Sequence, residues 1–149
     1  MRQQRDQPPD VLFIQAGVGG LLCAAADHFR ARESGPLIVS VEPEAADALL
    51  ESISSPAGEP CVSKGPQDSI MAGLNCSEVS LTAWPSIRRG VDMFVAIEDR
   101  LTIQAMKLLG DAGIDSGESG AAGLAGLLRL RDRFQGLRVL LVNTEGHCT

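Results

Sequence analysis

The chain has 149 residues, enough for one domain of ordinary size and too few for two. Thirteen basic and nineteen acidic side chains give a net charge of −6 without a basic cluster, which argues against nucleic acid or an anionic membrane as a partner. Apolar residues make up 44% of the chain and aromatic residues only 3%, so we expect a folded core built from aliphatic side chains.

The cysteines and histidines argue against a structural metal site. The four cysteines show no CxxC spacing and only two histidines accompany them, so we expect no zinc site. The sequence begins without a signal peptide, which favours a cytoplasmic location and free thiols. The longest uninterrupted apolar run, residues 21–26, is too short to cross a bilayer.

Apolar runs and helical periodicity alternate along the chain. The first ten residues are polar, contain two prolines and are expected to form a tail or linker. Four short apolar runs are typical of buried strands, at residues 11–14, 37–41, 93–97 and 139–142. Helices are predicted between them, at residues 21–33, 44–54, 79–89 (kinked near Pro85), 99–109 and 119–134. Residues 55–76 are rich in glycine and proline and are expected to form a loop.

This alternation predicts an α/β fold with a mainly parallel sheet and helices on both faces. In such sheets ligands bind beyond the carboxyl ends of the strands. Four places satisfy that rule, at residues 17–20, 42–43, 98–99 and 143–147.

The glycine-rich segment QAGVGG at residues 15–20 lies between an expected strand and helix. Free backbone amides at such a loop and helix start favour an anion such as phosphate, although glycines also serve plain tight turns. A dinucleotide fingerprint fits Gly17 and Gly19, with Glu42 as the acid for a ribose, but Leu22 stands where a small residue is needed. The phosphate cup of a pyridoxal-phosphate enzyme requires only a glycine run before a helix. Both interpretations remain open on spacing alone.

Further motifs follow the glycine loop in a fixed order: SIMAGLNC at residues 69–76, ESGAAGLAG at 118–126 and NTEG at 143–146. Together with the loop, VEP at 41–43 and the Ala83-Trp84 pair, they resemble diaminopropionate ammonia-lyase, a fold-type-II pyridoxal-phosphate enzyme related to tryptophan synthase β. The resemblance extends over nearly the whole chain from Val11. It implies that residues 11–149 form a partial pyridoxal-phosphate-binding domain, part of the large domain of that fold.

The resemblance implies elimination of ammonia from 2,3-diaminopropionate, giving pyruvate and a second ammonia. Pyridoxal 5'-phosphate acts as the electron sink in such reactions. Carried over residue by residue, the cup around its phosphate consists of Gly17, Val18, Gly19 and Gly20.

Three more positions are implied to meet the cofactor. Glu118 and Ser119 correspond to a polar wall beside it, and Thr144 to the residue that faces the pyridine nitrogen. The loop at residues 71–76 would line the site. Each also has a purely structural alternative, with Ser119 as a helix cap and Thr144 as a partner for a strand end.

The resemblance also implies a lysine whose amine forms a Schiff base with the cofactor. The chain contains only Lys64 and Lys107, neither in a motif like that of the family, which belongs upstream of the glycine loop. The ending HCT at residues 147–149 also departs from the family's acidic ending. We therefore expect a C-terminal fragment, truncated or decaying, that is inactive by itself.

Completed by the missing half, the site would take an amino-acid substrate, and the intact family is expected to form homodimers. Two alternatives remain: a non-catalytic partner subunit of a lysine-bearing chain, and a nicotinamide- or flavin-binding Rossmann-like domain. Without the upstream strands, apolar sheet edges would be exposed, so we expect the isolated chain to be marginally stable, prone to aggregation or dependent on a partner.

Overall fold

A computed structural model describes residues 7–146 of the chain. Within that range four parallel strands form one sheet in the order β3-β2-β1-β4. The strands are β1 (Val11–Gln15), β2 (Leu37–Pro43), β3 (Met93–Ile97) and β4 (Val139–Leu141). In the register of the sheet, Val11 pairs with Leu37 on one side and with Val139 on the other. The predicted α/β fold with a parallel sheet is thereby confirmed.

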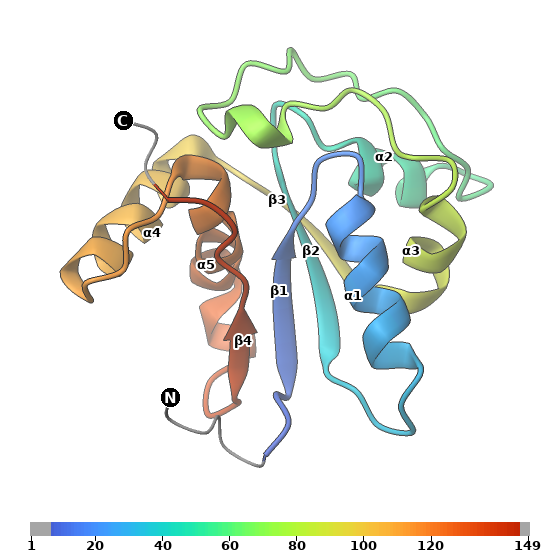
Figure 1. Ribbon diagram of the computed structural model, residues 1–149. Coiled ribbons are helices and arrows are strands. Elements are labelled where there is room, and N and C mark those ends of the chain that lie inside the picture. Colours follow the sequence, from blue (N-terminus) through green and yellow to red (C-terminus); the bar gives the residue numbers. More distant parts are fainter. Residues whose placement is uncertain (1–6, 147–149) are drawn as a thin grey trace.

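Helices cover both faces of the sheet (Figure 1). One face carries α1 (Gly20–Arg30), α2 (Ala48–Ser54) and α3 (Trp84–Gly90). The other carries α4 (Asp99–Asp111) and α5 (Glu118–Leu130). Two single 3₁₀ turns, η1 (Ala72–Leu74) and η2 (Arg131–Arg133), lie within the connections.

Alternate side chains of β1 divide the core into two layers. Leu12 and Ile14 pack with α1, α2 and α3, whereas Phe13 packs with α5 on the opposite face. Glycine allows α5 to lie close to the sheet, because a Cβ on Gly126 would come within 2.5 Å of Val41 Cγ2. Gly126 therefore serves the close packing of α5 on the sheet.

Two helices begin later than the periodicity predicts. Pro85 lies in the first turn of α3, so the helix starts at Trp84, and the expected kink in a longer helix is wrong. A proline in the first turn loses no intrahelical hydrogen bond, which makes it a helix start rather than a break. The helix expected from residue 44 starts at Ala48, because β2 continues to Pro43 and a turn follows.

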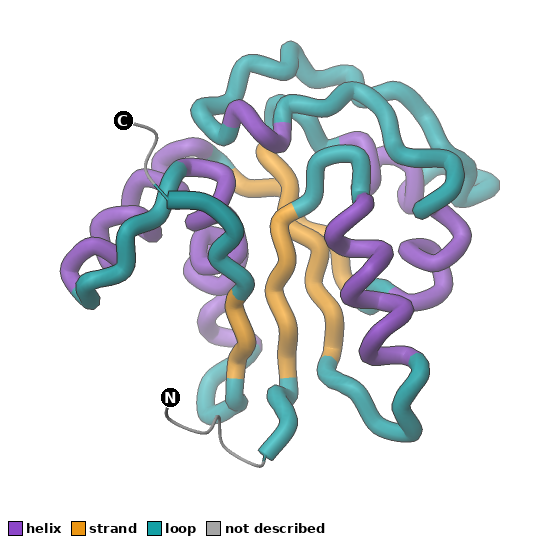
Figure 2. The backbone as a smooth tube through the Cα atoms, in the orientation of Figure 1, coloured by secondary structure: helices purple, strands orange, loops and turns teal. Residues whose placement is uncertain are grey.

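The carboxyl ends of the four strands lie at one end of the sheet, and the long connection from α2 to α3 arches over that end (Figure 2). At the opposite end Asp10, the last residue of the expected tail, accepts hydrogen bonds from the backbone amide and the guanidinium of Arg138. No helix in the described part of the chain is long and apolar enough to span a membrane.

Candidate functional site

A cavity of about 380 Å³ opens where β1 ends and α1 begins. Four segments that are far apart in the sequence supply its walls: residues 15–21, the loop around η1, the first turn of α5 and the segment after β4. Of the seven residues assigned individually to the cofactor, six line this cavity: Gly17, Val18, Gly19, Gly20, Ser119 and Thr144. The loop at residues 71–76, also expected to line the site, contributes Gly73, Leu74 and Cys76. Glu118 does not line it, and its side chain is half-buried at the start of α5.

The backbone amides of residues 17–22, which we name the anion cup, have no hydrogen-bond acceptor among the described residues. None of the six donates a hydrogen bond to any residue between 7 and 146, and the first donor of α1 is the Cys23 amide, 2.8 Å from the Gly19 carbonyl oxygen. Unpaired amides at a helix start bind anions through hydrogen bonds and the helix dipole. The cup therefore fits a phosphate group.

The three glycines of the cup differ in how strictly their surroundings require glycine. Gly19 has a φ of +100°, and a Cβ there would come within 2.5 Å of Ile87 Cδ1, so only glycine fits. A Cβ on Gly17 would lie 3.0 Å from Cys76 Sγ. A Cβ on Gly20 would meet nothing within 4 Å, so this cavity-lining residue can accept a side chain without a clash at Cβ.

The wall from α5 is built by a carboxylate that the sequence analysis missed. Glu145 Oε1 accepts hydrogen bonds from the amides of Ser119 (2.9 Å) and Gly120 (3.3 Å), so this carboxylate caps α5. The Ser119 hydroxyl oxygen instead accepts a hydrogen bond from the Gly73 amide at 3.1 Å. Ser119 therefore joins α5 to the loop at residues 71–76, and its side chain is not the helix cap.

Thr144 is held by a second residue absent from the sequence prediction. The side-chain amide of Gln15 donates to Thr144 Oγ1 at 2.7 Å, and Gln15 is only 4% exposed. A threonine hydroxyl that accepts this bond still has its own proton to donate. Gln15 is the single polar side chain in its strand, which is the signal that sequence reasoning could have used.

Among the described residues no lysine or arginine lines the cavity, and Glu145 is the only formally charged one in its walls. Lys64 is exposed elsewhere, and Lys107 pairs with Asp111 on α4 at 2.8 Å. Attraction for an anion must therefore come from the backbone amides and the α1 dipole. Neither lysine of this sequence is placed to reach a ligand in the cavity.

Glu42 does not serve a ribose. It is 0% exposed, and its carboxyl oxygens accept hydrogen bonds from the amides of Leu49 (2.8 Å) and Leu50 (2.9 Å) at the start of α2. Burial raises the pKa of Glu42 to about 8, an effect that the two amide bonds only partly offset. The dinucleotide interpretation thus loses the acid on which it depended.

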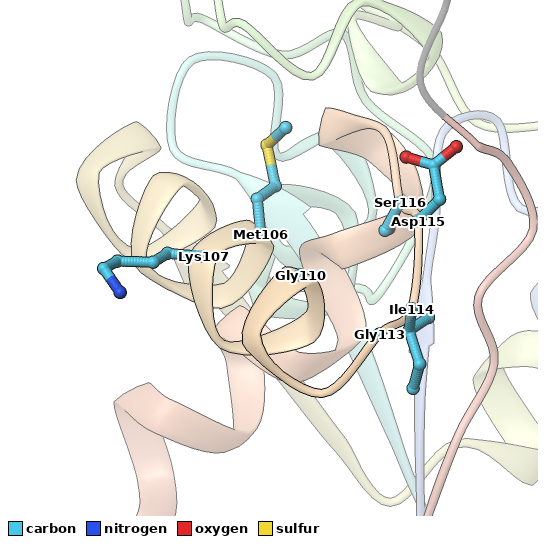
Figure 3. Close-up of a pocket in the computed structure, with 7 residues that line it drawn as sticks. All are labelled: Met106, Lys107, Gly110, Gly113, Ile114, Asp115 and Ser116. Atoms are coloured by element: carbon cyan, nitrogen blue, oxygen red, sulfur yellow. The ribbon is translucent and has the colours of Figure 1, made fainter.

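A second and larger hollow, of about 580 Å³, lies between the end of α4 and the connection to α5 (Figure 3). Lys107 and Asp115 stand on opposite sides of it in that view. None of the sequence-selected site residues lines it, so its size alone does not make it the functional site.

Comparisons with known proteins agree with this geometry. A family model described as "Pyridoxal-phosphate dependent enzyme" matches residues 1–145. Diaminopropionate ammonia-lyase of Salmonella typhimurium is 34% identical, with 93% of this chain and 39% of the relative aligned. The Escherichia coli K12 enzyme of the same name is 35% identical over 98% of this chain and 41% of its own length. The chain thus spans about two-fifths of the curated relatives it matches.

Solved structures show the same arrangement. Diaminopropionate ammonia lyase from Escherichia coli superposes with a TM-score of 0.77 at 27% identity, covering 95% of this chain and 40% of that one. Maize serine racemase, at 24% identity, superposes with a TM-score of 0.85 over 95% of this chain and 44% of its own. With four parallel strands, a cup of free amides and a family match over most of its length, this chain belongs to the pyridoxal-phosphate dependent enzymes.

Proposed function

We propose that this chain is the cofactor-phosphate-binding part of a pyridoxal-phosphate-dependent ammonia-lyase that acts on 2,3-diaminopropionate. The observation that carries the proposal is the anion cup, with six consecutive backbone amides that lack a partner among the described residues. Relatives 34% and 35% identical support the substrate, since both bear the name diaminopropionate ammonia-lyase.

The residues of the cavity fit the cofactor. The amides of residues 17–22 would hold its phosphate, and the Thr144 hydroxyl, oriented by Gln15, would donate to its ring nitrogen. Bound there, pyridoxal phosphate supplies an electron sink for charge that develops at the substrate α-carbon. Ser119 and Glu145 hold the start of α5 and thereby keep the opposite wall in place.

The amine that bonds the cofactor must come from outside this sequence. Lys64 and Lys107 do not line the cavity, so we propose that the 149-residue chain by itself eliminates no ammonia. The same observation favours a second candidate, a non-catalytic subunit that joins a separate lysine-bearing chain. The homodimer and the cytoplasmic location expected from the resemblance and the sequence stay predictions.

Binding of the cofactor is tested at Gly20. Because a Cβ there meets nothing within 4 Å, Gly20→Asp and Gly20→Asn should both fold, and they differ mainly in charge. Calorimetric titration with pyridoxal 5'-phosphate should show binding to Gly20→Asn that is about tenfold or more tighter than to Gly20→Asp, because the added carboxylate repels phosphate. Pyridoxal without the phosphate is the ligand control. Equal affinity for the two variants, or for pyridoxal and its phosphate, would refute the cup assignment.

The reaction and its substrate need a completed site. We would coexpress the chain with the part of the Salmonella typhimurium relative that lies upstream of the match, and measure pyruvate released from 2,3-diaminopropionate and from serine. Pyruvate from 2,3-diaminopropionate alone supports the proposed substrate, whereas greater release from serine refutes it. A stable complex that releases no pyruvate from either compound supports the non-catalytic subunit.

A further inference from the structure

Glu42 does not line the cavity, although it lies near the carboxyl end of β2, where ligands bind in such sheets. Its carboxyl group is fully buried and touches no cavity described above. Instead its two oxygens accept hydrogen bonds from the backbone amides of Leu49 and Leu50, in the first turn of α2. No side chain at the preceding N-cap, Asp47, takes that place.

The same helix leads from Glu42 to the anion cup. Leu49, whose backbone amide donates a hydrogen bond to Glu42, is fully buried. Its Cδ2 atom lies 3.3 Å from the position that a Cβ on Gly19 would occupy. The Cδ1 atom of Ile87 lies 2.5 Å from the same position. Two contacts, one polar and one apolar, therefore connect a buried carboxyl group to the backbone that would hold phosphate.

We propose that Glu42 is a positioning residue of the anion cup: by holding the first turn of α2, its carboxyl group keeps Leu49 against Gly19 and so fixes the orientation of the cup amides. This inference rests on the proposed function only in naming phosphate as the ligand. The coupling within the chain stands on the contacts alone.

Because α2 is short, its position depends on the hydrogen bonds that Glu42 accepts from its first turn. A helix of seven residues is far too short to be stable by its own hydrogen bonds, so its position depends on packing and capping. Replacing Glu42 by an apolar residue leaves two amides without their acceptor, one of them buried, and the cheapest remedy is to move the first turn toward water. Leu49 moves with that turn, and Gly19 loses a neighbour.

The charge on Glu42 decides which variant is conservative. Asp47 and Glu51 are the charged groups that act on it, both acidic, while its partner on the adjacent strand β3, Ala96, is uncharged. Burial raises the pKa of Glu42 to about 8, so the neutral acid dominates at pH 7. Gln has no charge and a similar size, but only its oxygen can accept, so it keeps one of the two amide hydrogen bonds, whereas Leu accepts none.

The experiment compares Glu42→Leu with Glu42→Gln and Ser52→Ala in the full chain. Ser52 is a matched control, because it is buried at the other end of α2 and its hydroxyl oxygen accepts the Cys61 amide at 3.0 Å. Two readouts are recorded at pH 7: the amide resonances of Gly19 and Gly20 without ligand, and the affinity for pyridoxal 5'-phosphate. Leu49→Ala, alone and combined with Glu42→Leu, completes a double-mutant cycle.

Glu42→Leu should move the Gly19 and Gly20 resonances and weaken binding about tenfold, a usual size for such coupling. Glu42→Gln, which keeps one of the two acceptors, should change both readouts less than Glu42→Leu does, and Ser52→Ala should change neither. Leu49→Ala should reproduce the Leu variant, with no further loss in the double variant. If Glu42→Leu does not fold, Leu49→Ala carries the test.

Unmoved Gly19 and Gly20 resonances in the Leu49→Ala variant would overturn the inference, as would equal effects of Glu42→Leu and Ser52→Ala or additive losses in the cycle. Failure of the unsubstituted chain to bind pyridoxal 5'-phosphate would overturn the proposed function. The ligand-free resonances would still decide the coupling through α2 in that case.

Discussion

The side-chain amide of Gln15 donates to the hydroxyl oxygen of Thr144 over 2.7 Å, although 129 positions separate the two residues. The bond joins the end of β1 to the segment after β4 across one wall of the cavity. It explains how a segment that follows a three-residue strand keeps a fixed place beside the cup.

Removing the hydrogen bond between Gln15 and Thr144 should lower the free energy of unfolding, and a double-mutant cycle should show that the two side chains are coupled. Gln15→Met and Thr144→Val should each lower the free energy of unfolding by about 1 kcal/mol, the usual net worth of such a hydrogen bond. Urea denaturation of the two single variants and the double variant measures the coupling. The double variant should be no less stable than the worse single one, while fully additive losses would show that the bond contributes nothing.

Thr82→Val is the matched control for that cycle. Its hydroxyl also forms a side-chain hydrogen bond, at 3.0 Å to Ser80, but on the exposed surface. We expect no measurable change in the free energy of unfolding, because water replaces the lost partner.

The positive φ of Gly19 leads to a second prediction about stability. Gly19→Ala should destabilise the chain by about 1–3 kcal/mol, because alanine is strained at positive φ and its Cβ meets Ile87. Gly110→Ala should instead stabilise it by about 0.5–1 kcal/mol, since this residue lies in α4 and a Cβ there meets nothing within 4 Å. Thermal unfolding followed by circular dichroism compares them, and a Gly19→Ala variant as stable as Gly110→Ala would contradict the geometry.

Local patterns explain what could be predicted from the sequence. The apolar runs of the strands and the glycines before α1 depend on residues a few positions apart, so their spacing reveals them. Glu145 on the α5 amides and Gln15 on Thr144 depend instead on tertiary approach, which no spacing reports. Glu42 was ambiguous for a further reason: an acid near the end of a strand can face a ligand or hold the next helix, and only burial distinguishes the two.

Glu42 should also make stability fall as the pH rises. Its pKa is about 8 in the folded chain and 4.5 ordinarily, so the folded chain retains the proton that the unfolded chain releases between these values. The contribution is complete below pH 4.5 and is lost as the pH rises through about 8. Urea denaturation from pH 5 to 9 should show this decline, and Glu42→Gln should flatten it in part. A residual slope is expected, because burial also raises the pKa of Asp47.

Asp10→Asn is the control for this titration. Hydrogen bonds from Arg138 lower the pKa of Asp10 to about 2, so its contribution is lost only as the pH falls from 3.8 through about 2. The variant should therefore leave the slope between pH 5 and 9 unchanged. An identical slope in the Glu42→Gln variant and the unsubstituted chain would show that Glu42 titrates normally.

The edge of the sheet at β4 makes the last prediction. Within residues 7–146, β4 pairs only with β1, and Leu140 is 38% exposed on this edge strand. Unpaired edge strands with apolar side chains promote association, and lysine is a common natural remedy. Leu140→Lys should raise the temperature at which light scattering begins, whereas Ile103→Lys, at a 59% exposed position on α4, should not. Equal onset temperatures for the two variants would place the aggregating surface elsewhere, because both add the same charge and differ only in whether the charge protects a strand.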